Sequence, residues 1–157
     1  MITNPDTINA WFHGQKIYRG ITINEDGTVD YTGNLAITVN PIPFQFGTIT
    51  GHFSTTALNI ETFEGFPRII KGHFSVFGSN AASMSGLHKH VRHIGGQVVC
   101  RTDATHLLGL LLIDGVENID VDRGPIDKIL MNHIGAHDVI SCQDELLDAG
   151  FVEQAKL

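Results

Sequence analysis

A segment of the chain repeats itself after 21 residues, the interval between Gly51 and Gly72. Ile49–Pro67 begins I-T-G-H-F-S, and Ile70–His88 begins I-K-G-H-F-S. The identical pairs are Ile49/Ile70, Gly51/Gly72, His52/His73, Phe53/Phe74, Ser54/Ser75, Asn59/Asn80 and Gly65/Gly86. A repeat of roughly 20–29 residues predicts short coils that stack into a solenoid, because one coil alone cannot bury its apolar side.

A third copy of the repeat follows, in which Gly96 and Val98 correspond to Gly72 and Phe74 at an interval of 24 residues. The three additional residues predict a loop in the segment Lys89–His93. Side chains at the phenylalanine position are expected to line up in one continuous dry interior, because alternate residues of a strand face the same side.

Strand patterns precede and follow the repeats. Before them we expect a strand at Tyr18–Ile23, a turn at residues 24–27, and rungs at Thr28–Tyr31 and Asn34–Val39. After them, Leu107–Ile113 reads as a last apolar rung. Gly65 and Gly86 mark bends at which a positive φ is expected.

Helical patterns occupy both ends of the chain. Residues 4–13 predict a short helix with Asn4 as its N-cap, and two further helices are expected after Asp122. Because an open coil exposes apolar edges and unpaired strand groups, we interpret both helical ends as caps. The sequence therefore predicts a single repeat domain, 1–157, with an N-terminal helical cap and hairpin at 1–27, a solenoid at 28–122 and a C-terminal helical cap at 123–157.

The motif G-x-F-x-x-x-x-x-x-[IL]-x-x-[LF]-x-G-x-P, seen at Gly51–Pro67, resembles short leucine-rich-repeat-like proteins encoded by tailed bacteriophages. Thr22–Asp30 resembles their N-terminal hairpin, and Cys142–Gly150 resembles their C-terminal helix. The resemblance implies a mainly β fold, a leucine-rich-repeat-like right-handed solenoid of short parallel rungs between helical caps. It also implies a phage origin, and therefore the cytoplasm of a host cell.

The bulk composition narrows the classes of partner and compartment. The formal net charge of −7 argues against a nucleic-acid backbone or an anionic membrane as the main partner. No apolar run approaches the ~20 residues that span a bilayer, and no secretory signal is visible. The two cysteines, Cys100 and Cys142, make no disulfide framework, so we expect a reducing, cytoplasmic setting.

Histidine is the unusual residue, with nine in the chain. His52 and His73 hold the same repeat position, and rungs ~4.8 Å apart would stack their rings as an exposed ladder. The candidate partner-binding residues are His52, His73, His88, Lys89, His90, Arg92 and His93. A metal site built on these histidines is an alternative, since imidazole binds Zn²⁺. However, no Cys-x-x-Cys or His-Glu-x-x-His motif supports one, so no metal ligand is assigned.

The sequence favours a non-enzymatic protein-binding solenoid over an enzyme. Asp103 and His106 could act in catalysis only together with a nucleophile, Ser54 or Ser75. No nucleophile elbow surrounds either serine. No catalytic residue or cofactor is therefore expected. The phage resemblance points to a host-encoded protein partner, a defence component or other machinery that the chain would engage or inhibit. A metal-dependent module and a structural or virion-associated protein remain alternatives, and the oligomeric state stays open.

Overall fold

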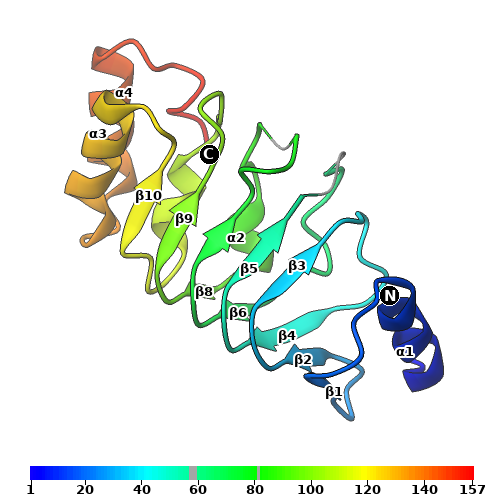
Figure 1. Ribbon diagram of the computed structural model, residues 1–157. Coiled ribbons are helices and arrows are strands. Elements are labelled where there is room, and N and C mark those ends of the chain that lie inside the picture. Colours follow the sequence, from blue (N-terminus) through cyan, green and yellow to red (C-terminus); the bar gives the residue numbers. More distant parts are fainter. Residues whose placement is uncertain (57–59, 81) are drawn as a thin grey trace.

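The computed structural model describes residues 1–56, 60–80 and 82–157, which form a β-solenoid of about four turns (Figure 1). Sheet A contains, in this order, β1 (Ile21–Ile23), β2 (Val29–Tyr31), β4 (Phe46–Ile49), β6 (Ile69–Ile70) and β8 (His93–Ile94). Sheet B contains, in this order, β10 (Asn118–Asp120), β9 (Gln97–Val99), β7 (Phe74–Ser75), β5 (Phe53–Thr55) and β3 (Leu35–Ile37).

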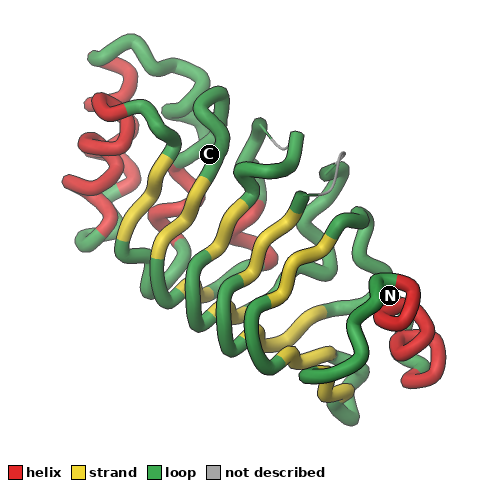
Figure 2. The backbone as a smooth tube through the Cα atoms, in the orientation of Figure 1, coloured by secondary structure: helices red, strands yellow, loops and turns green. Residues whose placement is uncertain are grey.

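Each coil runs through one strand of sheet A, a tight corner, one strand of sheet B and a longer return segment (Figure 2). Among the described residues, neighbouring coils pair in parallel, and the β1–β2 hairpin is the one antiparallel pair. Phe53 pairs with Phe74, which pairs with Val98, and all three side chains are fully buried. The predicted continuous interior is therefore confirmed.

Aromatic side chains fill much of this interior. The rings of Phe53 and Phe74 stack with their centroids 5.9 Å apart, and Phe66 meets both edge-on. The bends after the strands also follow the prediction, since Gly65 has φ of +82° and Gly86 has φ of +78°. A Cβ at Gly65 would meet the backbone of the preceding coil at Phe44, so both its conformation and its surroundings require glycine.

Two predictions about the later coils are corrected. The additional residues of the third copy do not form a loop over all of Lys89–His93. Instead, Leu87–His90 make the short helix α2, whose first residue, Leu87, is buried in the core. Leu107–Ile113 is not a rung, because Leu108–Leu112 form a 3₁₀ helix, η1. Its buried leucines come in adjacent pairs rather than in alternation, which a strand with one buried face cannot accommodate.

The last parallel strand is β10, which the sequence analysis does not predict. Ile119 and Val121 are buried, whereas Asn118 and Asp120 are half-buried. This alternation is the period-2 signal of a strand, and the flanking aspartates obscured it. β10 pairs with β9, so sheet B extends one strand beyond the repeats.

Helices lie at both ends of the solenoid (Figure 1). The helix α1 (Pro5–Gly14) begins where the Asn4 side chain accepts a hydrogen bond from the Thr7 N–H, and it buries Ile8 and Phe12. The Phe12 ring packs on Phe44, 5.4 Å away between centroids. At the other end α3 (Gly124–Ile134) lies beside β10 and packs on α4 (Val139–Asp148). Within the described ranges, no helix has both the length and the apolar character needed to cross a membrane.

The C-terminal segment returns to the solenoid instead of extending the last helix. The His106 N–H donates to the Glu153 carbonyl at 2.9 Å, and the Gln154 side-chain amide donates to the Ala104 carbonyl at 3.0 Å. This segment therefore joins the end of the chain to the return of the coil that contains β9.

The burial of the phenylalanine stack predicts that replacing Phe74 lowers the stability of the protein much more than replacing Phe77. Phe74→Ala should lower the free energy of unfolding by about 3–5 kcal/mol, because it opens a cavity among stacked rings. Phe77→Ala, at a side chain that is 57% exposed, should change it by less than about 0.5 kcal/mol. Urea unfolding followed by circular dichroism measures both values. Equal losses in the two variants would contradict the buried stack.

Candidate functional site

The repeated histidines lie at the corners where sheet A turns into sheet B. The rings of His52 and His73 stack with centroids 4.6 Å apart and an interplanar angle of 5°. Both side chains are exposed. The ladder expected from the sequence is therefore present, at the corner immediately before the sheet B strands.

Each side chain in this row accepts a hydrogen bond from the backbone of the next coil. The Asn34 Oδ1 accepts from the His52 N–H at 2.8 Å. The His52 Nδ1 accepts from the His73 N–H at 2.9 Å, and the His73 Nδ1 accepts from the Gln97 N–H at 2.8 Å. We call Asn34, His52 and His73 the corner ladder. It links four successive coils through one line of side chain-to-backbone hydrogen bonds.

These bonds set the chemistry of the imidazoles. A ring nitrogen that accepts a hydrogen bond carries no proton, so the neutral His52 and His73 rings hold their proton on Nε2. The stacked rings therefore offer N–H donors to the outside and keep their acceptors for the backbone. A doubly protonated imidazolium has no acceptor nitrogen, so it cannot make the bond to the next coil.

The glycine that precedes each sheet B strand belongs to the same arrangement. A Cβ at Gly51 would collide with the Asn34 Oδ1 of the coil before it. At Gly72 and Gly96 it would collide with the Nδ1 of His52 and of His73. The repeated Gly-His pair is thus one structural unit, in which each histidine occupies the space that the next glycine leaves open. The Gly-His pair that recurs in the two copies is the sequence signal of this unit, whereas the sequence analysis considers the two histidines only as an exposed ladder for partner binding or, alternatively, for a metal.

The outer surface of sheet B carries no formal charge in the coils of β3, β5 and β7. In the coil of β9 the first charge is Arg101, two residues after Val99, at the position that Thr38, Thr56 and Phe77 hold in the other coils. Its central row is formed in register by Ala36, Ser54, Ser75 and Val99. We define the sheet B face as this row with its flanking residues, all exposed or half-exposed: Asn34, Ala36, Thr38, His52, Ser54, Thr56, His73, Ser75, Phe77, Gln97 and Val99. Charge reappears only beyond this face, for example at Asp120 of β10, whose Oδ2 accepts from Gln97 Nε2 at 3.2 Å.

The structure does not bring all the predicted site residues to one place. Lys89 and His90 lie on α2 and line a groove of about 620 Å³ between two return segments. Arg92 is exposed just before β8, and His93 lies within β8 on sheet A. These residues are thus separate from the corner ladder at His52 and His73.

His88 has a structural position of its own. Its Nδ1 is buried and lacks a hydrogen-bond partner among the described residues. The same nitrogen occupies the space that a Cβ at Gly109 would need. Burial is the largest of the effects that lower the pKa of His88, and the charges of Lys89 and His90 lower it further. The Nδ1 side of His88 is therefore packed against the next coil, and the assignment of His88 to partner binding stays a prediction.

The residues considered for catalysis are held in other interactions. Asp103 forms an ion pair with Arg101, with 2.8 Å between Oδ1 and Nε. The His106 Nδ1 lies 3.0 Å from the Thr105 hydroxyl oxygen and 3.3 Å from that of Ser83. In the part of the chain that the structure describes, no group of three or more histidine, cysteine or acidic side chains is arranged to hold a metal ion.

Comparison with known proteins gives no relative for this chain. No protein-family model, no curated protein and no solved structure matches it. The resemblance to phage-encoded leucine-rich-repeat-like proteins therefore stays a prediction, and the candidate surfaces are defined by their own geometry.

The corner ladder predicts which replacements of His73 the coil can tolerate. His73→Asn should retain most of the stability, because Asn34 makes the equivalent bond in the first coil. His73→Leu should lose about 1 kcal/mol more, because the Gln97 N–H is left without its acceptor. Chemical unfolding at pH 7.5 compares the two. A leucine variant as stable as the asparagine variant would contradict the role of Nδ1.

Because the two thiols are buried, we predict that an alkylating reagent modifies them only when the protein unfolds. Burial raises the pKa of Cys100 to about 12 and that of Cys142 to about 11, with nearby carboxylates adding to both shifts. Because a thiol reacts through its thiolate, neither residue should react measurably with iodoacetamide in the folded protein at pH 8. Both should react fully in 8 M urea, as checked by mass spectrometry. Rapid modification of either thiol under native conditions would contradict its burial.

Proposed function

We propose that this chain is a non-enzymatic protein-binding solenoid that holds a partner against the sheet B face. The observation that carries the proposal is the absence of formal charge on that face, in a chain whose net charge is −7. The centres of protein interfaces are depleted in charged residues, and desolvating neutral polar groups costs less than desolvating charges. Stacked repeats offer a broad surface of this kind.

The shape of the sheet B face supports the same function. The central row carries short side chains, so a partner can approach the backbone closely along the whole row. Phe77 at its margin is 57% exposed and offers an aromatic anchor of the type that interface centres favour.

The corner ladder adds rigid hydrogen-bond donors to this face. Each ring is held by a stacked neighbour and by a backbone hydrogen bond, so binding a partner orders little that is not ordered already. Preorganised groups lose less conformational entropy on association. The Nε2–H groups of His52 and His73 would meet carbonyl or carboxylate oxygens of the partner.

The proposal also covers the type of solenoid, the origin of the chain and the identity of its partner. The Gly51–Pro67 motif supports a leucine-rich-repeat-like, right-handed solenoid of phage origin that acts on a host protein in the host cytoplasm. Burial of Ile8 and Phe12 against Phe44 supports a capping role for α1, and the position of α3 beside β10 supports the same role at the other end.

A pull-down with variants that alter charge tests the proposal. The tagged chain is used to capture proteins from bacterial lysate, next to the double variant S54R/S75R, which places two charges in the central row. The control N9R/N132R adds the same two charges at exposed positions on α1 and α3. We expect one stoichiometric partner with the unmodified chain and the control, and at least about tenfold less with S54R/S75R.

Two results would contradict this assignment. One is the absence of any stoichiometric partner for the unmodified chain. The other is capture of the same partner in equal amount by S54R/S75R, provided that its unfolding midpoint matches that of the control. The second result would show that the partner binds a surface other than the sheet B face.

A further inference from the structure

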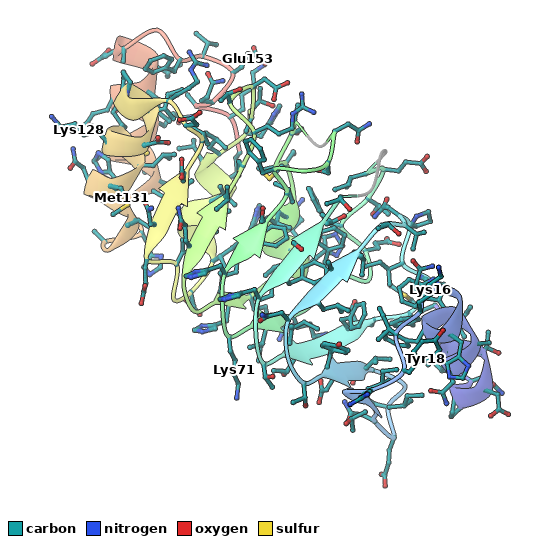
Figure 3. All side chains as sticks on the ribbon, in the orientation of Figure 1. Lys16, Tyr18, Lys71, Lys128, Met131 and Glu153 are labelled. Carbon is teal, nitrogen blue, oxygen red and sulfur yellow. The ribbon has the colours of Figure 1, made fainter. Side chains whose placement is uncertain are left out.

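Sheet A differs from sheet B because it gathers unpaired cations. Arg68 and Arg92 occupy equivalent positions just before β6 and β8, and the Arg92 N–H donates to the Arg68 carbonyl at 2.9 Å. Both side chains are exposed. Lys71 follows β6 at the corner and projects away from the strands into solvent (Figure 3). We call Arg68, Lys71 and Arg92 the basic strip.

No carboxylate neutralises the basic strip within the described ranges. The ion pairs found there are Arg101–Asp103, His133–Glu145 and Lys156–Glu153, all outside the strip. In sheet A, the carboxylates lie beyond the two coils that carry it. Asp30 is on β2, where its Oδ1 accepts from the Thr48 N–H. Asp114 lies in the coil next to Arg92, where its N–H donates to the Arg92 carbonyl at 3.0 Å, but its carboxylate forms none of the ion pairs found in the described ranges.

A third carboxylate, Asp26, interacts only weakly with the charge of Arg68. The pKa of Asp26 is lowered first by hydrogen bonds from the Thr28 side chain and backbone, and only to a smaller extent by the charge of Arg68. Among the described residues, Asp26 and Arg68 form no ion pair. Like charges on neighbouring strands repel each other, so an anion placed between the two arginines would stabilise this arrangement.

We infer that the basic strip binds an acidic segment of the protein partner, with carboxylates of that segment bridging Arg68 and Arg92. The inference rests on the proposed protein-binding function and adds a second contact on the neighbouring sheet. A guanidinium group binds a carboxylate through two parallel hydrogen bonds, which makes arginine well suited to this contact. The exposed Ile69 and the half-buried His93 lie in register between the charged ends of the strip.

The spacing of the coils fits an extended peptide. Neighbouring strands lie about 4.8 Å apart, and alternate side chains of an extended chain are about 6.6–6.8 Å apart. Long arginine side chains cover this difference, so carboxylates at alternate positions of an acidic segment can each reach one arginine. A polynucleotide is a poorer fit, because the net charge of −7 repels a long polyanion and the strip offers only these three cations.

Peptide titration tests the inference without a cellular partner. The probe is a fluorescein-labelled (Glu-Ser)₄ peptide, and its anisotropy is followed as the full chain is added in 20 mM and 150 mM NaCl. The variant R68Q/R92Q removes the arginine pair. The control K16Q/K128Q removes two exposed cations outside sheet A, since Lys16 follows α1 and Lys128 lies on α3 (Figure 3).

We expect saturable binding by the unmodified chain and the control, weaker at the higher salt concentration, and on the order of tenfold weaker binding by R68Q/R92Q. Absence of saturable binding, or equal loss in both variants, would overturn the inference. Tighter binding of a labelled 20-nucleotide single-stranded DNA than of the peptide would also overturn it, in favour of a phosphate backbone.

The two proposals fail separately. If the peptide does not bind but S54R/S75R still loses the cellular partner, the basic strip is wrong and the sheet B face stands. If the peptide binds as expected but no partner depends on Ser54 and Ser75, the strip stands and the sheet B face is wrong.

Discussion

The hydrogen bonds of the corner ladder hold each coil in register with the next. A parallel stack of such short strands has few backbone bonds per rung, and a slip of one residue would move its buried side chains to the solvent face. The bonds from the His73 N–H to His52 and from the Gln97 N–H to His73 fix the same position in three successive coils. With the register held there, the stack of Phe53, Phe74 and Val98 can form in one interior.

The same constraint shapes the two outer surfaces. Because the glycines at the corners leave room for the rings, the imidazoles lie flat against one another and extend the neutral sheet B face. Of the cations of these coils, Arg68, Lys71 and Arg92 lie on the sheet A side and form none of the ion pairs found among the described residues, whereas Arg101, just after β9, is paired with Asp103. One acidic chain thus presents a neutral surface and a basic surface on adjoining sheets. A partner that contacts both would combine a neutral, closely packed contact with a charged one, which improves specificity more than either contact alone.

The elements with local signals were predictable from the sequence. The repeat interval gave the solenoid, the Asn4 cap gave the start of α1, the helical pattern after Asp122 gave two further helices, and the paired glycines gave the bends at Gly65 and Gly86. The expected ladder of His52 and His73 was also correct in its spacing. The predicted equivalence of Asn59 and Asn80 is not compared, because Asn59 lies outside the described residues.

The parts that depend on neighbouring coils were harder to predict. η1 was mistaken for a rung because a run of leucines fits several buried conformations, and only the surrounding coils select one. β10 was not predicted because its apolar alternation is short, with only Ile119 and Val121 buried among aspartates. The role of Nδ1 in the ladder and the pairing of Arg68 with Arg92 both require the register between coils, which a single sequence does not state.

The tautomers of His52 and His73 test the central claim most directly. A two-bond ¹H–¹⁵N correlation spectrum of uniformly labelled protein at pH 8 distinguishes a protonated from an unprotonated ring nitrogen. We expect both residues as the neutral form with the proton on Nε2, and with Nδ1 shifted by an accepted hydrogen bond. Protons on Nδ1, or rings that exchange rapidly between the two tautomers, would show that the coils are not joined through these histidines.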